Sequence, residues 1–203
     1  MKIKLYQDDI PANLKFKDTV AIDTEAMGLN HNRDRLCLVQ LSNGDGICHL
    51  VKINEVKKKP LNLLKILTNK KILKIFHYAR FDIGILNYTY DISIKNIYCT
   101  KIASKLARTF TDQHGLKHLC KDILNETILK QEQTSDWGSK KLSISQQKYA
   151  ATDVLYLHKL MKKLNEILIR EKRMKLAMGC FNFVEHRVLL DLSGWSDLDI
   201  FKH

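Results

Sequence analysis

Apolar and polar positions alternate along the first half of the chain in short runs that turn residues separate. Three runs follow one another, at 19–25, 35–42 and 46–53, and the turn "SNGDG" connects the last two. Short connections permit only antiparallel pairing, so these runs predict an antiparallel meander of three strands. The first ten residues, "MKIKLYQDDI", also alternate like a strand, and their acids are not typical of a signal peptide.

The middle of the chain changes to alternating helix and strand patterns. A helical segment near 61–69 precedes a buried strand at 71–77, and a helix at 79–90 precedes a strand at 96–100. This strand-helix-strand order predicts a parallel extension of the sheet. From residue 101 onward the spacing is helical, with helices expected over 101–108, 115–124, about 145–170 and 173–188. The fold class is therefore α/β, with a mixed five-stranded sheet flanked by helices.

Length and composition are those of a globular domain. The chain has 203 residues with 45% apolar and 28% charged side chains, and no run approaches the roughly 18 to 20 apolar residues of a membrane span. The five cysteines are widely spaced and form no CxxC pair, which favours reduced thiols in a cytoplasmic protein. No membrane partner is expected.

The net charge is +12, from 34 Lys and Arg against 22 Asp and Glu. Such an excess favours polyanionic partners such as nucleic acid. A lysine-rich composition with solvated side chains explains the same number, so charge alone does not decide the function.

Four acids and one tyrosine occupy positions that structure brings together. Asp23 and Glu25 end the first run of the meander, and residues i and i+2 of a strand share a face. Asp82 lies in the first turns of the helix at 79–90, after the fourth strand. Tyr149 and Asp153 are four residues apart, on one face of an otherwise apolar helix. Asp23 and Glu25 are therefore either a solvated strand end or half of a metal site, because carboxylates buried together require compensating cations.

An oxygen-rich site of this kind suits two divalent cations. Hard Mg²⁺ or Mn²⁺ prefers carboxylates and keeps water ligands, and two such ions stabilise the attacking and leaving oxygens of a phosphodiester. A tyrosine beside the site can orient the attacking water through its hydroxyl. The residues thus predict a metal-dependent phosphodiesterase.

The segments "DTE", "HYARFD" and "YAATD" resemble the three motifs of the DEDD superfamily of 3′-5′ exonucleases, which have a ribonuclease H-like fold. Tyr-x3-Asp in the third motif is similar to the tyrosine branch, because the histidine branch has a His where this chain has Lys148. Similarity to ribonuclease D continues through "LCLVQLS", "TKIAS" and "SDWGSKKLSISQQKYAATDVLYL", which covers most of the chain.

This resemblance implies a role for each residue of the predicted site. Asp23, Glu25 and Asp153 correspond to ligands of the first metal ion, and Asp23 also bridges to the second. Asp82 corresponds to a second-metal or water-mediated ligand. Tyr149 corresponds to the residue that positions the attacking water.

A more specific resemblance is to the nano-RNase C class, which cleaves dinucleotides at the end of RNA decay. The matching segments are "DTEAMGL", "RDRLCLVQLS", "CTKIASKLARTFTD" and the terminal "GWSDLDIF". Ribonuclease D proper continues into helical RNA-binding domains, whereas residues 1–203 are expected to form a single exonuclease domain. Members of the class assemble as homo-octamers, which implies an interface role for the helix and apolar tail at about 173–203.

Three further residues are candidates for substrate binding. Leu29 follows "DTEAMG", where the resemblance implies an apolar wedge between two bases, although a core contact is the ordinary role of such a leucine. His77 precedes the second motif and is a candidate for the terminal ribose or for a capping role. Lys101 is a candidate for phosphate binding or a solvated charge.

The sequence therefore predicts a cytoplasmic, Mg²⁺- or Mn²⁺-dependent 3′-5′ exoribonuclease that converts very short RNA, above all diribonucleotides, to nucleoside 5′-monophosphates. One alternative is a broader ribonuclease D-like exonuclease acting on tRNA 3′ ends, longer RNA or DNA. An alternative of another class is a nucleic-acid-binding scaffold without catalysis.

Overall fold

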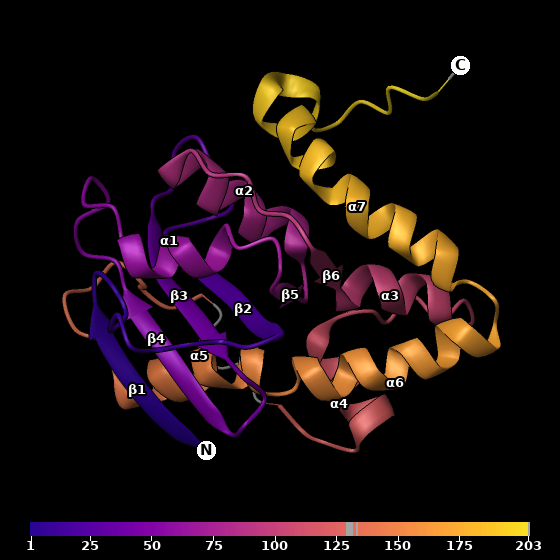
Figure 1. The fold of residues 1–203 in the computed structure, drawn as a ribbon, viewed down its shortest axis with the longest axis horizontal. Helices are drawn as coiled ribbons and strands as arrows, with labels where there is room; N and C mark the ends of the chain where they lie inside the picture. The colour runs from indigo at the N-terminus through magenta and orange to yellow at the C-terminus, as the bar shows by residue number, and fades with distance from the viewer. Residues whose placement is uncertain (129–131, 133, 203) are drawn as a thin grey trace.

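A six-stranded mixed sheet forms the centre of the protein (Figure 1). The structure is a computed structural model and describes residues 1–128, 132 and 134–202. The order of strands across the sheet is β1-β4-β3-β2-β5-β6. The strands are β1 (Lys2–Gln7), β2 (Thr19–Ala26), β3 (Leu36–Ser42), β4 (Ile47–Lys52), β5 (Leu73–Phe76) and β6 (Ile97–Cys99).

The predicted meander is confirmed at the middle of this sheet. Strands β2, β3 and β4 are antiparallel neighbours, and Gln40 of β3 pairs with Asp23 on one side and with Leu50 on the other. The parallel extension is also confirmed, because β5 joins β2 and β6 joins β5 in parallel. The three residues at 23, 40 and 50 therefore share one face of the sheet.

The expected count of five strands is wrong, because β1 adds a sixth. It pairs in parallel with β4 from Lys2↔Ile47 to Gln7↔Lys52, outside the meander. The alternation at the N-terminus indicates a strand, but parallel partners lie far apart in sequence and local pattern does not identify them. Exposed Lys2 and Lys4 suit an edge position, where charges discourage further strand pairing.

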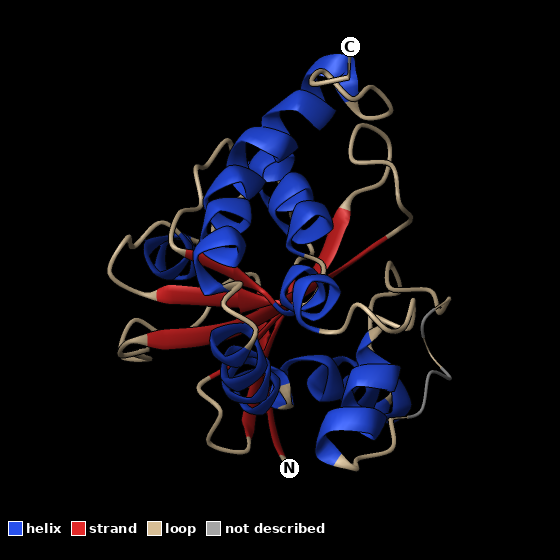
Figure 2. Ribbon diagram, turned by 90° about the vertical axis from the view of Figure 1, so that its right-hand side faces the viewer, coloured by secondary structure: helices blue, strands red, loops and turns tan. Residues whose placement is uncertain are grey.

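Helices lie on both sides of the sheet (Figure 2). Helix α5 packs against β2, β3 and β4 on one face, whereas α2 packs against β2, β3 and β5. The helices are α1 (Leu61–Leu67), α2 (Ala79–Tyr90), α3 (Thr100–Ala107), α4 (Leu116–Leu124), α5 (Ile144–Leu155), α6 (Leu157–Arg170) and α7 (Met174–Leu190). A π-helical turn at Asp191–Trp195 extends α7. In the part of the chain that the structure describes, no helix is long and apolar enough to cross a membrane.

The predicted long helix at 145–170 is in fact two helices. Tyr156, with φ −95° and ψ −10°, ends α5 and begins α6. Helix α5 packs against the sheet and α6 against α3 and α4, so the break allows each helix to bury its own apolar face. No glycine or proline marks this point in the sequence, which explains why the periodicity alone indicated one helix.

Candidate active site

Three carboxylates from two elements meet at the end of β2. Asp23 and Glu25 come from β2 and Asp153 from α5, and one oxygen of each lies within 4.8 Å of the others. Strand alternation directs residues 23 and 25 to the face that α5 covers, and α5 carries Asp153 toward them. A register shift between Glu25 and Ala26 ends the regular pairing with β3 here, as β-bulges beside active sites do.

Asp82 approaches the same strand from its other face. It lies in the first turn of α2 and is 2% exposed. The hydroxyl of Thr24, between the two acids of β2, donates a hydrogen bond of 2.8 Å to Asp82 Oδ1. Burial raises the pKa of Asp82 well above its ordinary value, and Asp23 raises it further. Asp82 therefore interacts electrostatically with the acids of β2, although it approaches the strand from the other face.

The cluster carries more negative charge than the protein alone compensates. Burial raises the pKa of Asp23 to about 7. Burial raises the pKa of Glu25 to about 10, and the charges of Asp23, Asp153 and Asp82 add to this shift. A divalent cation would supply the missing positive charge, and an all-oxygen set of donors fits Mg²⁺ or Mn²⁺. The residues present thus fit a divalent metal site.

Tyr149 lies one helical turn before Asp153 and is half-buried. Burial raises the pKa of its phenol, and Asp153, Glu25 and Asp23 raise it further. The hydroxyl therefore stays protonated at neutral pH and remains a hydrogen-bond donor beside the carboxylates. The Trp137 ring packs at 6.0 Å from the Tyr149 ring.

Gln40 is a neighbour of the site that sequence reasoning missed. Its Nε2 donates to Asp23 Oδ2 at 3.3 Å, across the β2–β3 pair. Its buried Oε1 has no hydrogen-bond partner among the described residues. A single glutamine within the apolar run "LCLVQLS", opposite an acid of the next strand, was the available signal.

Leu29 is 85% exposed, on the loop between β2 and β3. Asp34 closes this loop: its carboxylate accepts a hydrogen bond of 3.0 Å from the Asn30 N–H and forms an ion pair with Arg33. The alternative role of Leu29, a core contact, is therefore absent from the described structure, and the leucine faces solvent. Leu29 borders a hollow of about 420 Å³, which is also lined by Asn30, His31, Asn32, Tyr78, Arg80, Phe81, Asp191, Leu192 and Ser196.

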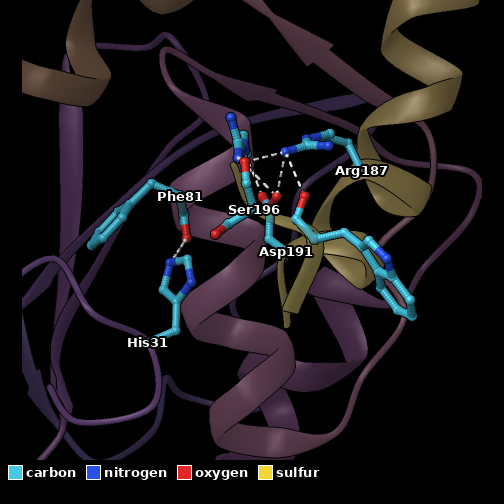
Figure 3. Close-up of polar contacts among 7 residues, drawn as sticks. His31, Phe81, Arg187, Asp191 and Ser196 are labelled. Carbon is cyan, nitrogen blue, oxygen red and sulfur yellow. Dashed lines mark hydrogen bonds and ion pairs between the residues drawn. The ribbon is translucent and has the colours of Figure 1, made fainter. Parts of the chain in front are cut away.

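The C-terminal segment lines part of this hollow through Asp191, Leu192 and Ser196, and Figure 3 shows Asp191 and Ser196 beside Arg187. Asp191 forms ion pairs with Arg80 of α2 and with Arg187 of α7, the latter at 2.9 Å. Arg187 also donates to the Ser196 carbonyl. The tail is thus fastened to the helix that carries Asp82.

His77 and Lys101 lie side by side at the ends of β5 and β6. His77 Nδ1 is 2.9 Å from the Thr100 hydroxyl, and the Lys101 N–H donates to the His77 carbonyl. The Lys101 ammonium lies 4.1 Å from the centroid of the Tyr78 ring.

Lys101 also lines a larger cleft, of about 1010 Å³, between α7 and the helices α2 and α3. Its lining combines cations with apolar and aromatic side chains. The lining residues are Tyr78, Arg80, Cys99, Lys101, Ile102, Lys105, Lys172, Lys175, Leu176, Gly179, Cys180, Phe183, Val184 and Arg187. Because Tyr78 and Arg80 line both spaces, the cleft is a neighbour of the hollow at Leu29.

A ribonuclease H-like α/β fold that gathers carboxylates at the end of a central strand defines a nuclease of the exonuclease class. Comparison with known families agrees, because residues 7–169 match the 3′-5′ exonuclease family. The chain belongs to this family and is ribonuclease D-like, and the family depends on divalent metal ions.

Curated relatives are longer than this chain. Ribonuclease D of Gluconacetobacter diazotrophicus is 33% identical over 162 residues, which cover 79% of this chain and 40% of the relative. DNA polymerase I of Aquifex aeolicus is 34% identical over 149 residues, covering 72% of this chain and 24% of the relative. The chain thus spans about two fifths of the ribonuclease D that it matches.

Solved structures match over the full length. Brucella melitensis NrnC bound to pGG is 48% identical with a TM-score of 0.96, covering 100% of this chain and 99% of that one. The same Brucella protein with bound Mg²⁺ is 46% identical with a TM-score of 0.95, and each chain is covered completely.

Proposed function

We propose that this protein is a divalent-metal-dependent 3′-5′ exoribonuclease that hydrolyses very short RNA, preferentially diribonucleotides, to nucleoside 5′-monophosphates. The observation that carries the proposal is the convergence of Asp23, Glu25 and Asp153 within 4.8 Å, with Tyr149 one turn away. The full-length likeness to Brucella NrnC, solved with pGG and with Mg²⁺, supports the choice of substrate and cofactor.

The carboxylates have distinct tasks in this proposal. Asp23, Glu25 and Asp153 would hold one ion, and Asp82, with Asp23, would hold a second directly or through water. Two bound divalent ions supply an activated water and charge stabilisation for both oxygens of the displacement. Gln40 holds Asp23 in place through its amide hydrogen bond.

Tyr149 orients the attacking water. Its phenol is held protonated by burial and by the neighbouring carboxylates, so it acts as a hydrogen-bond donor and not as a base. We expect Tyr149→Phe to lower kcat by about 100-fold, within the range typical of a positioned proton-handling group, with KM changed by less than threefold. Steady-state rates on a diribonucleotide measure this, and an unchanged kcat removes Tyr149 from the mechanism.

Substrate binding would use Leu29, His77 and the cationic cleft that Lys101 lines. Leu29 offers an exposed apolar side chain that would enter between two bases, and His77 would contact the terminal ribose. Lys101 and the other cations of the cleft favour the anionic backbone, and Tyr78 offers a face for stacking. A wedge at Leu29 limits stacking of a third base and hence favours dinucleotides.

The proposed enzyme is also a homo-oligomer of the cytoplasm. Apolar side chains remain exposed along the tail, with Trp195 at 45%, Leu198 at 56% and Phe201 at 66%. We assign them to an interface between copies of the chain, in a homo-oligomer that is an octamer in the class it resembles. All five cysteines are free thiols, which suits the reducing cytoplasm.

Initial rates on 5′-labelled RNAs of two to seven nucleotides, with Mn²⁺ or Mg²⁺ and limiting enzyme, test the function. A sharp maximum at two nucleotides supports it. Rates that stay level or rise with length favour the broader ribonuclease D-like exonuclease, for which the long cationic cleft would hold the remaining strand. RNA binding without hydrolysis in either metal favours the scaffold.

Two controls accompany this series. Asp23→Ala and wild type with EDTA should both be inactive, and the variant should keep the wild-type circular dichroism spectrum. Turnover by a folded Asp23→Ala enzyme contradicts the metal-site assignment.

A further inference from the structure

The turn Ser135–Gly138 contacts the site at Tyr149 and contributes no carboxylate to it. The Trp137 ring packs against Tyr149. Gly138 lies against Met27, where the loop of Leu29 begins, and a Cβ atom at Gly138 would be only 2.4 Å from the Met27 sulfur. A displacement of this turn would therefore be transmitted to Tyr149.

Side chains from α5, from β4 and from the loop before β3 hold the backbone of the turn. The Gln146 amide of α5 donates to the Asp136 carbonyl at 3.0 Å. The Arg35 guanidinium donates to the Gly138 carbonyl at 3.2 Å. The Lys52 ammonium of β4 donates to the Trp137 carbonyl at 2.7 Å, and this bond is buried.

Lys52 is the unusual member of this set. It is 2% exposed and lies at the end of a central strand, where register with Leu38 places it on the face that also carries Glu25. A buried ammonium group is costly unless it is hydrogen-bonded, so an apolar residue would serve the core better. The bond to Trp137 is the compensation that the structure provides.

The orientation of the Trp137 ring depends on this backbone. Its buried indole N–H has no hydrogen-bond partner within the described residues. The ring is thus placed by packing and by the main chain of the turn, whose carbonyl at the same residue is bound by Lys52.

We infer that Lys52 is a positioning residue for catalysis: by binding the Trp137 carbonyl it fixes the turn Ser135–Gly138 against Tyr149 and so sets the direction of the Tyr149 hydroxyl. The inference rests on the proposed role of Tyr149 in orienting water. Lys52 does not touch substrate and acts through the turn.

Lys52→Met is the principal test, because methionine keeps the length and apolar stem of the side chain without its donor. On a diribonucleotide with Mg²⁺, we expect kcat to fall by about 10-fold, less than the roughly 100-fold cost of a 1 Å misplacement, with KM changed by less than twofold. Lys52→Arg, which keeps a cationic donor, should recover part of the loss.

Lys74→Met is the matched control. Lys74 is also a buried lysine, 0% exposed, on β5, and its ammonium donates to the Asn69 and Ile72 carbonyls, both at 2.8 Å. It has the same chemistry away from the turn. Lys74→Met should change thermal stability and leave kcat within twofold of wild type; an equal loss of kcat in both variants would mean a general effect of removing a buried lysine.

A double variant separates this inference from the proposed function. If Lys52 acts through Tyr149, Lys52→Met should have no further effect on kcat in a Tyr149→Phe enzyme. If Tyr149→Phe alone is slow and Lys52→Met slows it again by the full factor, the inference fails while the role of Tyr149 stands. If Tyr149→Phe keeps the wild-type rate, the proposed role and the inference fail together.

Tryptophan fluorescence gives a readout independent of turnover. The chain has two tryptophans, so a Trp195→Phe background leaves Trp137 as the reporter. Lys52→Met should increase acrylamide quenching of Trp137, whereas Lys74→Met should not. Quenching and kcat unchanged in a folded Lys52→Met protein would overturn the inference, and if Lys52→Met does not fold, Lys52→Gln takes its place in both measurements.

Discussion

The Glu25 carboxyl destabilises the metal-free folded protein at neutral pH, although it is one of the predicted metal ligands. Its carboxyl is surrounded by protein and by three other acids, which together raise its pKa to about 10. In the absence of a cation the folded chain keeps a proton there that the unfolded chain releases at neutral pH. The same surroundings make the group a strong ligand once a cation is present.

This arrangement predicts a pH-dependent stability in EDTA. The pKa of Glu25 rises to about 10 and that of Asp23 to about 7, so above the ordinary carboxyl pKa near 4 the folded state binds more protons than the unfolded state. The free energy of unfolding contributed by these groups therefore falls as pH rises from about 4 through these values.

Glu25→Gln should remove part of this loss. In EDTA at pH 8 we expect its Tm to exceed that of wild type by about 2–4 °C, which corresponds to about 1 kcal/mol in a chain of this size, and by less at pH 5. Mg²⁺ should raise the Tm of wild type but not of the variant. Differential scanning fluorimetry measures both, with exposed Glu55→Gln as the control, and a variant less stable than wild type in EDTA would contradict the argument.

At the scale of elements, the loop between β2 and β3 presents Leu29 because Asp34 closes it. The carboxylate of Asp34 accepts from the Asn30 backbone and pairs with Arg33. Gly28 permits this, since a Cβ atom there would be 2.3 Å from Asp34 Oδ2. The neighbouring Arg33 hydrogen bond lowers the pKa of Asp34 to about 2, so the closure persists throughout the physiological range.

Asp34→Ala should therefore weaken substrate binding more than turnover. We expect KM for a diribonucleotide to rise by about 10-fold, in the same direction as for Leu29→Ala, with kcat reduced less than KM is raised. Asp45→Ala is the control, because Asp45 closes the turn between β3 and β4 by accepting from the Ile47 N–H. A selective fall in kcat with constant KM would show that the loop does not hold substrate.

Elements also show what the sequence could and could not predict. Alternation and short turns were enough for the meander, and the spacing of Tyr149 and Asp153 was enough to put them on one helical face. The partner of β1 and the break at Tyr156 depend on tertiary packing, which leaves no local mark. The same holds for Lys52, whose bond to Trp137 joins residues that are distant in sequence.

At the scale of the whole molecule, the C-terminal segment is joined to the second-motif helix by Asp191. This carboxylate binds Arg80 of α2 and Arg187 of α7 together. Beyond it, the exposed side chains of Leu198 and Phe201 continue from Phe183 on α7, whose ring lies 6.0 Å from that of Phe201. The apolar surface is thus held in a defined place.

A double variant, Leu198→Asp with Phe201→Asp, tests the proposed interface. We expect its mass in size-exclusion chromatography with light scattering to fall below that of the wild-type assembly, because two charges oppose burial of the surface. Leu61→Asp changes a comparably exposed leucine, 63% exposed on α1, and should leave the mass unchanged. An undiminished mass in the double variant would place the interface elsewhere.

The distribution of the five cysteines has a practical consequence for following this protein at work. Cys37, Cys48, Cys99 and Cys120 are buried, whereas Cys180 is partly exposed and lines the cationic cleft with Lys101. A thiol-reactive dye should therefore label the native chain at one position without any engineering. Its emission would report occupancy of the cleft in real time, even by nucleotides that the enzyme does not cleave.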